Sequence, residues 1–280
     1  MAVKKRERDA GEKAGIEAEE VEQRASPHGH IVYEAVYKEG EHELERSNSA
    51  LAWSGLAAGL SMGFSLLSEA LLRSHLPDAP WRPLLAKFGY CIGFLVVVLG
   101  RQQLFTENTL TVILPLLRQK NLRTFLNVAR LWAIVLAANL VGTFLMAWLL
   151  GKTDAVEAPV HQGMRELGLI SMNHTFGALL LRGIFAGWLI ALMVWLLPFA
   201  ETARVWVIII ITYIVGVGEF SHTVAGSVDG FYVVVTGGKT FLEYLAYMAP
   251  ILIGNIIGGS TIVATIAHAE YIGSGERGGN

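Results

Sequence analysis

The chain has little charge outside its first 46 residues. Of its 46 Asp, Glu, Lys and Arg residues, 20 lie within residues 1–46, and the other 26 are spread over the remaining 234. Charged residues make up 16% of the whole chain, against about 25% in ordinary soluble domains. A body this poor in charge, in a chain that is 53% hydrophobic, excludes a soluble fold and indicates an integral membrane protein in a lipid bilayer.

Cysteine and the common chemical motifs are also scarce. The single cysteine, Cys91, cannot form an internal disulfide. A net charge of −2 and the lack of a basic patch with aromatic residues give no reason to expect a nucleic-acid partner. We find no zinc-ligand spacing, no nucleophile elbow and no phosphate-binding loop. The sequence therefore predicts no metal site, no cofactor and no enzyme activity.

Long apolar runs dominate what is present. A transmembrane helix needs about 20 mainly apolar residues, and six stretches satisfy this, so the sequence predicts an all-α integral membrane fold. The spans are residues 50–72, 84–118, 124–150, 175–198, 203–236 and 240–268. The second and fifth are too long for single straight helices, and each contains a polar break, "LFTENT" (104–109) and "EFSHTVAGS" (219–227).

Lysine and arginine in the short loops predict the orientation. With the amino terminus in the cytoplasm, the inner face receives the basic tail and the turn "RQKNLR" (118–123). We therefore expect both termini in the cytoplasm and three regions: a charged tail (1–46), a six-helix transmembrane domain (47–270) and a short carboxyl-terminal tail (271–280). Residues 28–46 are consistent with an amphipathic helix at the membrane surface, and residues 1–27 with a flexible polar leader.

An internal repeat links the two halves of the apolar body. "RTFLNVARLWAIVLAANLVG", from Arg123, aligns with "KTFLEYLAYMAPILIGNIIG", from Lys239, at an offset of 116. The matches include a Thr-Phe-Leu triplet and the polar pair Asn139 and Asn255. The same offset places Thr106 on His222. A weaker repeat of small residues, Gly59-x-x-x-Gly63 and Gly183-x-x-x-Gly187, has an offset of 124 and suits close helix packing.

Three helices followed by three more must have opposite topology in the membrane. Two inverted three-helix repeats are the plan of many transporters, whose site lies near the midplane at corresponding broken helices. Non-helical backbone at that depth is tolerated where it is buried in protein or lines a water-containing cavity. The broken second and fifth spans therefore predict a pathway between the two halves.

His222 is the strongest candidate in that pathway, because it is the one histidine within a span and away from its ends. An ionisable group at membrane depth is costly and is functional by default; the alternative is a neutral imidazole satisfied by a neighbouring helix carbonyl. Thr106 is expected to offer a hydroxyl from the opposite side, or to cap the short helix 110–118. Leu104 and Phe105 would form an apolar constriction or be ordinary core.

Two further pairs of residues accompany these positions. Asn139 and Asn255 are expected to hold the broken segments by hydrogen bonds to freed backbone groups. Glu107 and Glu219 each border a break, where an unpartnered carboxylate would repel anions, so we expect both to be solvated or partnered.

The motifs "LFTENT" (104–109), "RGIFAGWLIALMVW" (182–195), "SHTVAGS" (221–227) and "GNIIGG" (254–259) resemble the formate/nitrite transporter family. The resemblance covers most of residues 50–268, and is greatest to divergent bacterial inner-membrane members that carry "RQQLFTENT". It implies an aquaporin-like fold, a homopentamer with a pore in every protomer, and transport of small monovalent weak-acid anions together with protons. The resemblance also implies pore roles for His222, Thr106, Leu104 and Phe105, and a second apolar gate at Tyr90, Phe94, Ile190 and Val215.

Three positions differ from the pattern of the family. Ser221 stands where a glutamate commonly precedes the histidine, Gly226 stands where an asparagine commonly follows it, and Gly187 stands where an asparagine often precedes the tryptophan. We expect Ser221 at the pore and Gly226 at the helix break. Two other functions stay open: an aquaporin-like channel for neutral solutes, and a structural or sensory protein that does not conduct.

Overall fold

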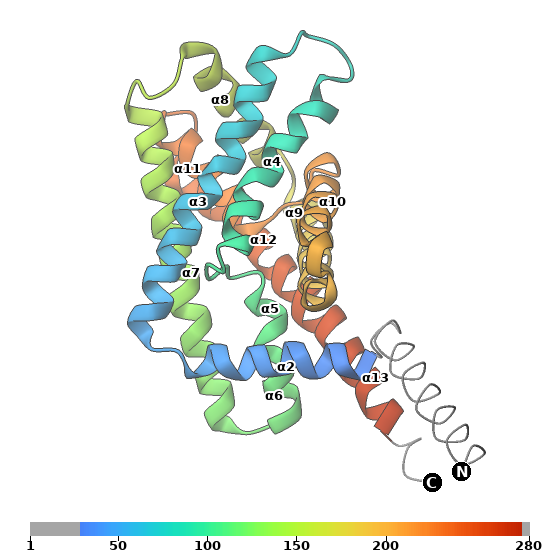
Figure 1. Ribbon diagram of the computed structural model, residues 1–280. Helices are drawn as coiled ribbons and strands as arrows, with labels where there is room; N and C mark the ends of the chain where they lie inside the picture. The colour runs from blue at the N-terminus through green and yellow to red at the C-terminus, as the bar shows by residue number, and fades with distance from the viewer. Residues whose placement is uncertain (1–28, 276–280) are drawn as a thin grey trace, which may run out of the picture.

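The computed structural model describes residues 29–275, and within them every regular element is a helix, with no strand. Figure 1 shows long helices running between two ends of the molecule, with one helix, α2 (Gly29–Glu45), lying across one end. We call this the α2 end. The opposite end, which carries the loop 76–81 and α8 (Ala158–Met172), is called the far end.

Five helical stretches are long and apolar enough to cross a membrane. They are α3 (Asn48–His75), α4 (Arg82–Leu99), α7 (Leu122–Lys152), α9 with the short helix η1 (Phe176–Phe199), and α12 to α13 (Phe241–Gly273). These cover the first, third, fourth and sixth predicted spans and the first half of the second. The predicted fifth span consists of two shorter helices, α10 (Arg204–Val217) and α11 (Thr223–Val235).

The second predicted span is also divided. Beyond α4 the chain leaves the helical path, and it then forms α5 (Asn108–Thr111) and α6 (Ile113–Gln119). A short helix, η2 (Glu201–Ala203), precedes α10. The last stretch is continuous: α12 (Phe241–Ile256) passes through a π-helical segment, η3 (Ile257–Ala264), into α13 (Thr265–Gly275). Such π-helical segments often lie at functional sites, and here Ser260 Oγ donates a hydrogen bond to the carbonyl of Thr109 at 2.7 Å.

Side-chain caps explain where the long helices begin. The first backbone N–H groups of a helix have no partner within it, and Ser, Thr and Asn side chains accept from them. Ser47 accepts from Ala50 N before α3, and Asn121 accepts from Thr124 N before α7. Thr240 and Glu243 form a reciprocal capping box before α12. Local sequence thus determines these boundaries without help from tertiary packing.

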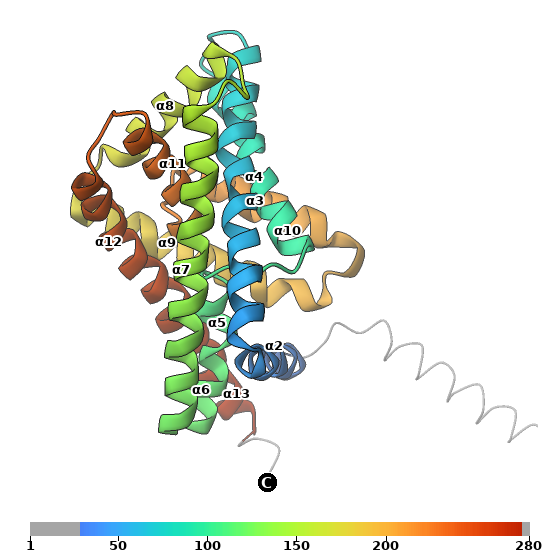
Figure 2. The same ribbon diagram turned by 90° about the vertical axis from the view of Figure 1, so that its left-hand side faces the viewer.

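Glycines allow α3 and α7 to lie against each other along much of their length, as Figure 2 shows. A Cβ at Gly59 would collide with the carbonyl oxygen of Asn139, and one at Gly142 would lie 2.5 Å from that of Leu56. The second half has a matching contact between α9 and α12, where a Cβ at Gly187 would collide with the carbonyl of Asn255. Small residues bring these backbones together.

The region 158–172, which lies between the third and fourth predicted spans, is a helix. Buried Val160, Met164 and Leu167 recur at helical spacing on one side of α8. They pack against α3 and α11, and His161 Nδ1 lies 2.8 Å from the Tyr232 hydroxyl. The segment is too short and too polar to span a bilayer, but its apolar side covers α11.

The α2 helix is bound to the body by a partly buried tyrosine contact and by ion pairs at the surface. The Tyr33 hydroxyl lies 2.8 Å from His268 Nδ1, and its ring stacks on Tyr271 at 4.2 Å. Ion pairs join Arg118 to Glu34 at 2.8 Å and Arg101 to Glu39 at 2.6 Å. Burial raises the pKa of Tyr33 to about 12, although the nearby Arg118 acts in the opposite direction. The residues before Gly29, which include most of the predicted tail, lie outside the described residues.

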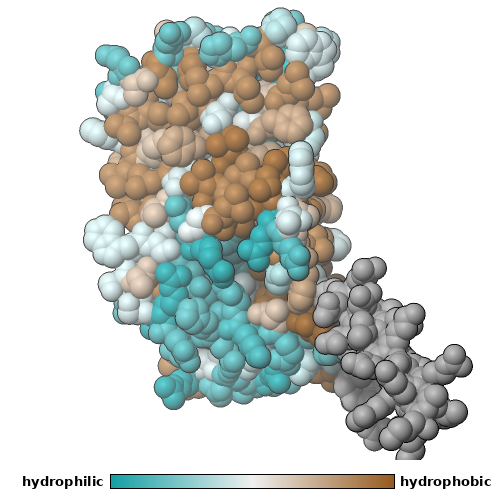
Figure 3. All heavy atoms as spheres, viewed as in Figure 1, coloured by the Kyte–Doolittle hydropathy of each residue, from teal (hydrophilic) through white to brown (hydrophobic). Residues whose placement is uncertain are grey.

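Large apolar side chains are exposed along the outside of the long helices. Figure 3 shows brown, hydrophobic residues over the upper part of one face, with hydrophilic residues gathered toward the α2 end. The most exposed are Trp53, Trp206, Leu122 and Leu242, which are 65% to 75% exposed. An apolar surface of this extent is what a bilayer or neighbouring protomers would cover.

Candidate functional site

The two interrupted spans break in the same way. Gly100 caps α4 and Gly218 caps α10, and each is followed by a residue in the left-handed region, Arg101 and Glu219, both with φ of 50°. Residues other than glycine rarely adopt this backbone conformation, and it is common where a helix ends. After each break the backbone crosses the interior in a non-helical segment before a new helix begins. The breaks therefore bring irregular backbone into the middle of the molecule.

Asn139 and Asn255 satisfy that irregular backbone with the same pattern of bonds. Asn139 Nδ2 donates to the carbonyls of Gly55 (2.7 Å) and Gln103 (2.9 Å), and its Oδ1 accepts from Phe105 N (2.9 Å). Both asparagines are completely buried.

The second asparagine repeats each of these bonds. Asn255 Nδ2 donates to the carbonyls of Gly183 and Ser221, both at 2.9 Å, and its Oδ1 accepts from Thr223 N at 2.8 Å. Freed backbone groups at both breaks thus have side-chain partners, which is the condition for irregular backbone at membrane depth.

These bonds correct the register of the internal repeat. Gln103 and Phe105 occupy the places of Ser221 and Thr223, so the offset within the breaks is 118, the difference between 221 and 103, and not 116. Gly55 corresponds to Gly183 and Gly59 to Gly187, an offset of 128 in place of 124. Because the connecting segments differ in length, one offset cannot align the whole repeat.

Thr106 and His222 meet directly, although the corrected register does not pair them. Thr106 Oγ1 lies 2.6 Å from His222 Nε2, and both residues are almost completely buried. His222 also caps α11, because its Nδ1 accepts from Ala225 N at 3.1 Å. Since Nδ1 accepts, the imidazole is neutral with its proton on Nε2, and this proton is donated to Thr106. Among residues 29–275, no backbone N–H of the following helix donates to the Thr106 hydroxyl, and no carbonyl bonds to the ring of His222.

Apolar side chains surround this pair. Leu104, Phe105, Phe94 and Ile190 are buried in one cluster. The Phe94 ring meets the His222 ring edge-on at 4.9 Å, and Phe105 packs edge-on against Trp132 at 5.6 Å. The polar pair is therefore enclosed by buried apolar side chains.

A cavity of about 210 Å³ opens from His222 toward the far end; we call it the far-side cavity. The cavity is lined by His222 and by four other residues that were singled out from the sequence: Tyr90, Val215, Ser221 and Gly226. Gly226 lies within the first turns of α11, not in the break, and a Cβ there would come within 2.7 Å of the Tyr247 hydroxyl.

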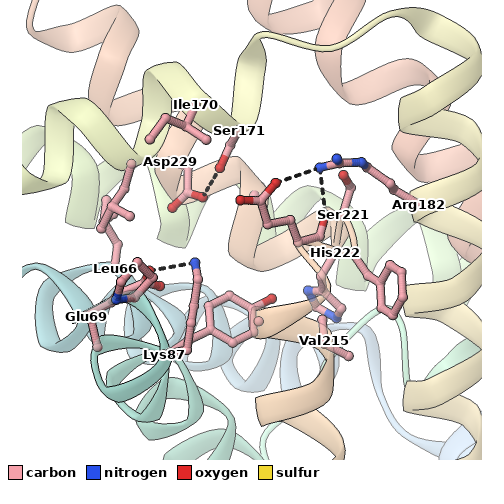
Figure 4. A pocket seen from close by; sticks show the side chains of 18 of the residues that line it. Leu66, Glu69, Lys87, Ile170, Ser171, Arg182, Val215, Ser221, His222 and Asp229 are labelled. Carbon is pink, nitrogen blue, oxygen red and sulfur yellow. Dashed lines mark hydrogen bonds and ion pairs between the residues drawn. The ribbon is translucent and has the colours of Figure 1, made fainter. Parts of the chain in front are cut away.

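Besides Glu219, the far-side cavity contains charged residues that the sequence analysis did not single out. Figure 4 shows Glu69 facing Lys87, and Asp229 facing Ser171. The Lys87–Glu69 ion pair measures 2.5 Å, Arg182 pairs with Glu219 at 3.1 Å, and Ser171 Oγ donates to Asp229 at 3.1 Å. The sequence contains a signal for two of these residues. Glu69 and Asp229 each interrupt a hydrophobic run, and a charged residue inside an apolar span is a functional candidate.

A second cavity, of about 410 Å³, opens on the α2 side of the Thr106–His222 pair; we call it the α2-side cavity. Its lining comes from α2, from the end of α4 and the break after it, from α5, from α9 with η1, and from the start of α10. It has no residue in common with the far-side cavity. Gln103, one residue before Leu104, is in its wall. The buried pair therefore lies between two separate cavities. No group of three or more His, Cys, Asp or Glu side chains among residues 29–275 is arranged to hold a metal ion.

Comparison with known proteins identifies the family. The family model for formate/nitrite transporters matches residues 30–269. The chain belongs to the formate/nitrite transporter family. It is 36% identical over 271 residues to the inner membrane protein YfdC of Escherichia coli, covering 96% of this chain and 86% of that protein. It is 23% identical to the formate channel BtFdhC of Bacillus thuringiensis, covering 86% and 94% of the two chains.

Solved structures show the same fold for this member of the formate/nitrite transporter family. An FNT family ion channel superposes with a TM-score of 0.74 at 18% identity, covering 86% of this chain and 98% of that one. A pentameric formate channel with formate bound gives a TM-score of 0.66 at 19% identity, covering 84% and 98%. BtFdhC and both solved structures are described as channels, and the family model describes transporters.

Proposed function

We propose that this chain is a channel or transporter for small monovalent weak acids and their anions, with one pore through each protomer. The observation that carries this proposal is the buried Thr106–His222 pair, bonded at 2.6 Å between two cavities. Membership of the family and the likeness to formate channels support it.

The proposed pore selects by charge at its narrowest point. Moving an ion into an apolar constriction is far more costly than moving the neutral acid. Leu104, Phe105 and Phe94 form that constriction, and Ile190 packs in the same cluster. We infer that the solute crosses it as the undissociated acid, with a proton supplied by water or through His222.

The polar pair gives the crossing solute its hydrogen bonds. His222 Nε2–H donates to Thr106, and the described residues provide no acceptor for the Thr106 hydroxyl proton. A passing carboxyl oxygen can accept that proton, while the positive amino-terminal end of α11 favours any negative charge that develops. Ser221, Tyr90 and Val215 would line the approach from the far-side cavity.

We also propose the finer architecture. Six membrane spans, with residues 203–236 as the broken fifth, would form two inverted three-helix repeats in an aquaporin-like fold within residues 47–270. The matching bonds of Asn139 and Asn255 support this arrangement. The solved formate channel is a pentamer, so we propose a homopentamer in the inner membrane. Gly29 and Gly275 lie at the same end, which supports both termini in the cytoplasm, flanking the proposed domain as tails (1–46 and 271–280).

Flux into reconstituted vesicles tests the function. Purified protein in liposomes is given formate, nitrite, acetate and lactate in turn, with and without a pH gradient, and uptake is compared with protein-free vesicles. We expect at least one of these solutes to enter faster with protein, and a pH gradient to change the rate. Rapid osmotic shrinkage without acid flux would instead support a neutral-solute channel. No movement of any solute would support a non-conducting protein.

A further inference from the structure

The last helical stretch, which runs from α12 through η3 into α13, holds the backbone on both sides of His222. Asn255 of α12 donates to the carbonyl of Ser221 and accepts from the N–H of Thr223, the two residues that flank the histidine. The place of the imidazole in the molecule is therefore fixed relative to this stretch. Whether its partner stays within bonding distance depends on what holds that partner.

The same stretch also bonds to the turn that carries Thr106. Ser260 lies in the π-helical segment η3, shortly after Asn255, and its Oγ donates to the carbonyl of Thr109 in α5. The hydroxyl of Thr109 in turn donates to the carbonyl of Thr106 at 2.7 Å. Figure 1 shows α5 beside this last stretch. Two hydrogen bonds in series thus connect η3 to the residue that meets His222.

Gly259 leaves the space in which the Thr109 hydroxyl lies. A Cβ on Gly259 would collide with Thr109 Oγ1 and would come within 2.8 Å of Thr109 Cβ. Thr109 is completely buried, and the backbone of η3 can approach it this closely only because position 259 has no side chain. Glycine here therefore lets the hydroxyl stay directed at the carbonyl of Thr106.

The first half of the repeat has no such link. At the offset of 116, the counterparts of Gly259 and Ser260 are Thr143 and Phe144 of α7. Thr143 bonds within its own helix, and Phe144 lies edge-on to Phe231 of α11 at 5.4 Å. The corresponding part of α7 is also regular α-helix, whereas η3 is π-helical. The link to the break therefore exists on the Thr106 side alone, and π-helical turns of this kind often lie at functional sites.

A second bond keeps α5 attached to the body independently of Ser260. Trp132 of α7 donates from its Nε1 to the carbonyl of Asn108 at 3.1 Å, and its ring packs against Phe105. Loss of the Ser260 hydroxyl would therefore loosen the turn without releasing it. This separates an effect on position from an effect on folding.

We propose that Ser260 is a positioning residue for the Thr106–His222 pair. It acts through Thr109 to hold Thr106 against the same stretch that holds His222, so that the two hydrogen-bonding groups stay at bonding distance. A hydrogen bond weakens steeply with misalignment, so a small displacement of the turn is enough to disturb it. The consequence for transport rests on the proposed function, but the positioning itself can be measured without transport.

The first test observes the ring of His222 by nuclear magnetic resonance. Protein labelled with ¹⁵N-histidine gives an Nε2–H signal for His222, which is assigned by its loss in His222→Phe. We expect Ser260→Ala to move this proton signal upfield, toward its position in Thr106→Val, because a weaker hydrogen bond deshields the proton less. Ser260→Thr keeps a hydroxyl and should restore the signal of the unaltered protein.

The control for this change is Ser61→Ala. Ser61 of α3 is half-buried like Ser260, and its side chain makes no hydrogen bond in the described part of the chain. We expect it to leave the His222 signal in place. A signal that stays unshifted in Ser260→Ala would overturn the inference, whatever the protein transports.

Gly259→Ala tests the same link from the other side. The added methyl group would displace the Thr109 hydroxyl from the carbonyl of Thr106, so we expect the same upfield shift of the His222 signal. Gly177→Ala adds the same group to α9 at a position where no atom lies within 4 Å, and should cause no shift. A shift of equal size in both variants would contradict the role of Gly259.

Formate uptake by reconstituted protein tests the consequence for transport. We expect Ser260→Ala to lower uptake per inserted protein about fivefold, the effect of weakening one hydrogen bond. In a Thr106→Val background the same change should have little further effect, because Ser260 acts through Thr106.

The two backgrounds distinguish positioning from general structure. Equal fold losses with and without the Thr106 hydroxyl would overturn the inference and leave the proposed function intact. Absence of uptake by the unaltered protein for every weak acid would overturn the proposed function, while the shift of the His222 signal would still decide whether Ser260 positions the pair.

Discussion

At the scale of single residues, the sequence indicates the central pair but not the charges around it. His222 stands out because a histidine in an apolar span is costly, and Thr106 stands out because it lies in the other break. Their contact at 2.6 Å could not follow from the repeat, since the corrected register does not pair them. Lys87 and Glu69 meet only because α3 and α4 pack together.

The first prediction concerns the Thr106 hydroxyl. Thr106→Val keeps the shape of the side chain, but it leaves the His222 Nε2 proton without its acceptor and removes the hydroxyl that a solute would meet. We expect weak-acid flux to fall roughly tenfold, a loss of about 1.4 kcal/mol. Thr106→Ser should keep most of the flux because the hydroxyl stays.

The control for this prediction is Thr143→Val. Thr143 is also buried, and its hydroxyl bonds only to the Leu140 carbonyl of its own helix. We expect its flux to stay near that of the unaltered protein. Equal flux in Thr106→Val and Thr143→Val would contradict the role of the central pair.

At the scale of elements, local sequence predicts the helix boundaries well and the connecting segments poorly. Ser47, Asn121 and Thr240 are caps that can be recognised from residue type. The helix α8 was missed because its apolar spacing is short and lies among polar residues, and its value as a cover for α11 is a tertiary property.

Removing one of the two buried asparagines tests how the breaks are held. Asn139→Ala would leave two backbone carbonyls and one N–H without partners at membrane depth, which costs about 2–4 kcal/mol in stability. We expect its thermal unfolding midpoint in detergent to fall by several degrees, and Asn255→Ala to behave alike. Asn127→Ala, on the same helix as Asn139 and without a side-chain bond in the structure, should unfold like the unaltered protein.

The docking of α2 should weaken at high pH because of Tyr33. Burial raises the pKa of Tyr33 to about 12 from the ordinary value of 10.0. Between pH 10 and pH 12, Tyr33 loses its proton when α2 is detached from the body but keeps it when α2 is docked. Docking is therefore fully favourable below pH 10 and weakens as the pH rises toward 12. We expect the difference in ultraviolet tyrosinate absorbance between the unaltered protein and Tyr33→Phe to appear only near pH 12. A difference complete by pH 10 would contradict the buried position.

At the scale of the whole molecule, composition predicts a membrane protein, the long apolar runs predict helices, and the motifs predict the family. The helical fold of residues 29–275, its long apolar helices and the family are confirmed. The two cavities could not be predicted, because their walls join side chains from five or more separate elements. The net charge of each cavity depends on which of these side chains pair.

Labelling from the two sides of the membrane tests the proposed orientation. In a Cys91→Ser background, Lys120→Cys lies beside α6 at the α2 end, and Lys152→Cys ends α7 toward the far end. We expect an impermeant maleimide to label Lys152→Cys in intact spheroplasts and Lys120→Cys only in inverted vesicles. The reverse pattern would contradict cytoplasmic termini.

The central claim is that a weak acid crosses the constriction at His222 without net charge. The most direct measurement follows formate entry and internal pH together in reconstituted vesicles, with and without an imposed membrane potential. We predict that each formate entering through the protein brings a proton, that the potential leaves the rate unchanged, and that His222→Phe reduces entry to the level of protein-free vesicles. Formate entry that follows the potential without acidifying the interior, or that persists undiminished in His222→Phe, would contradict the claim.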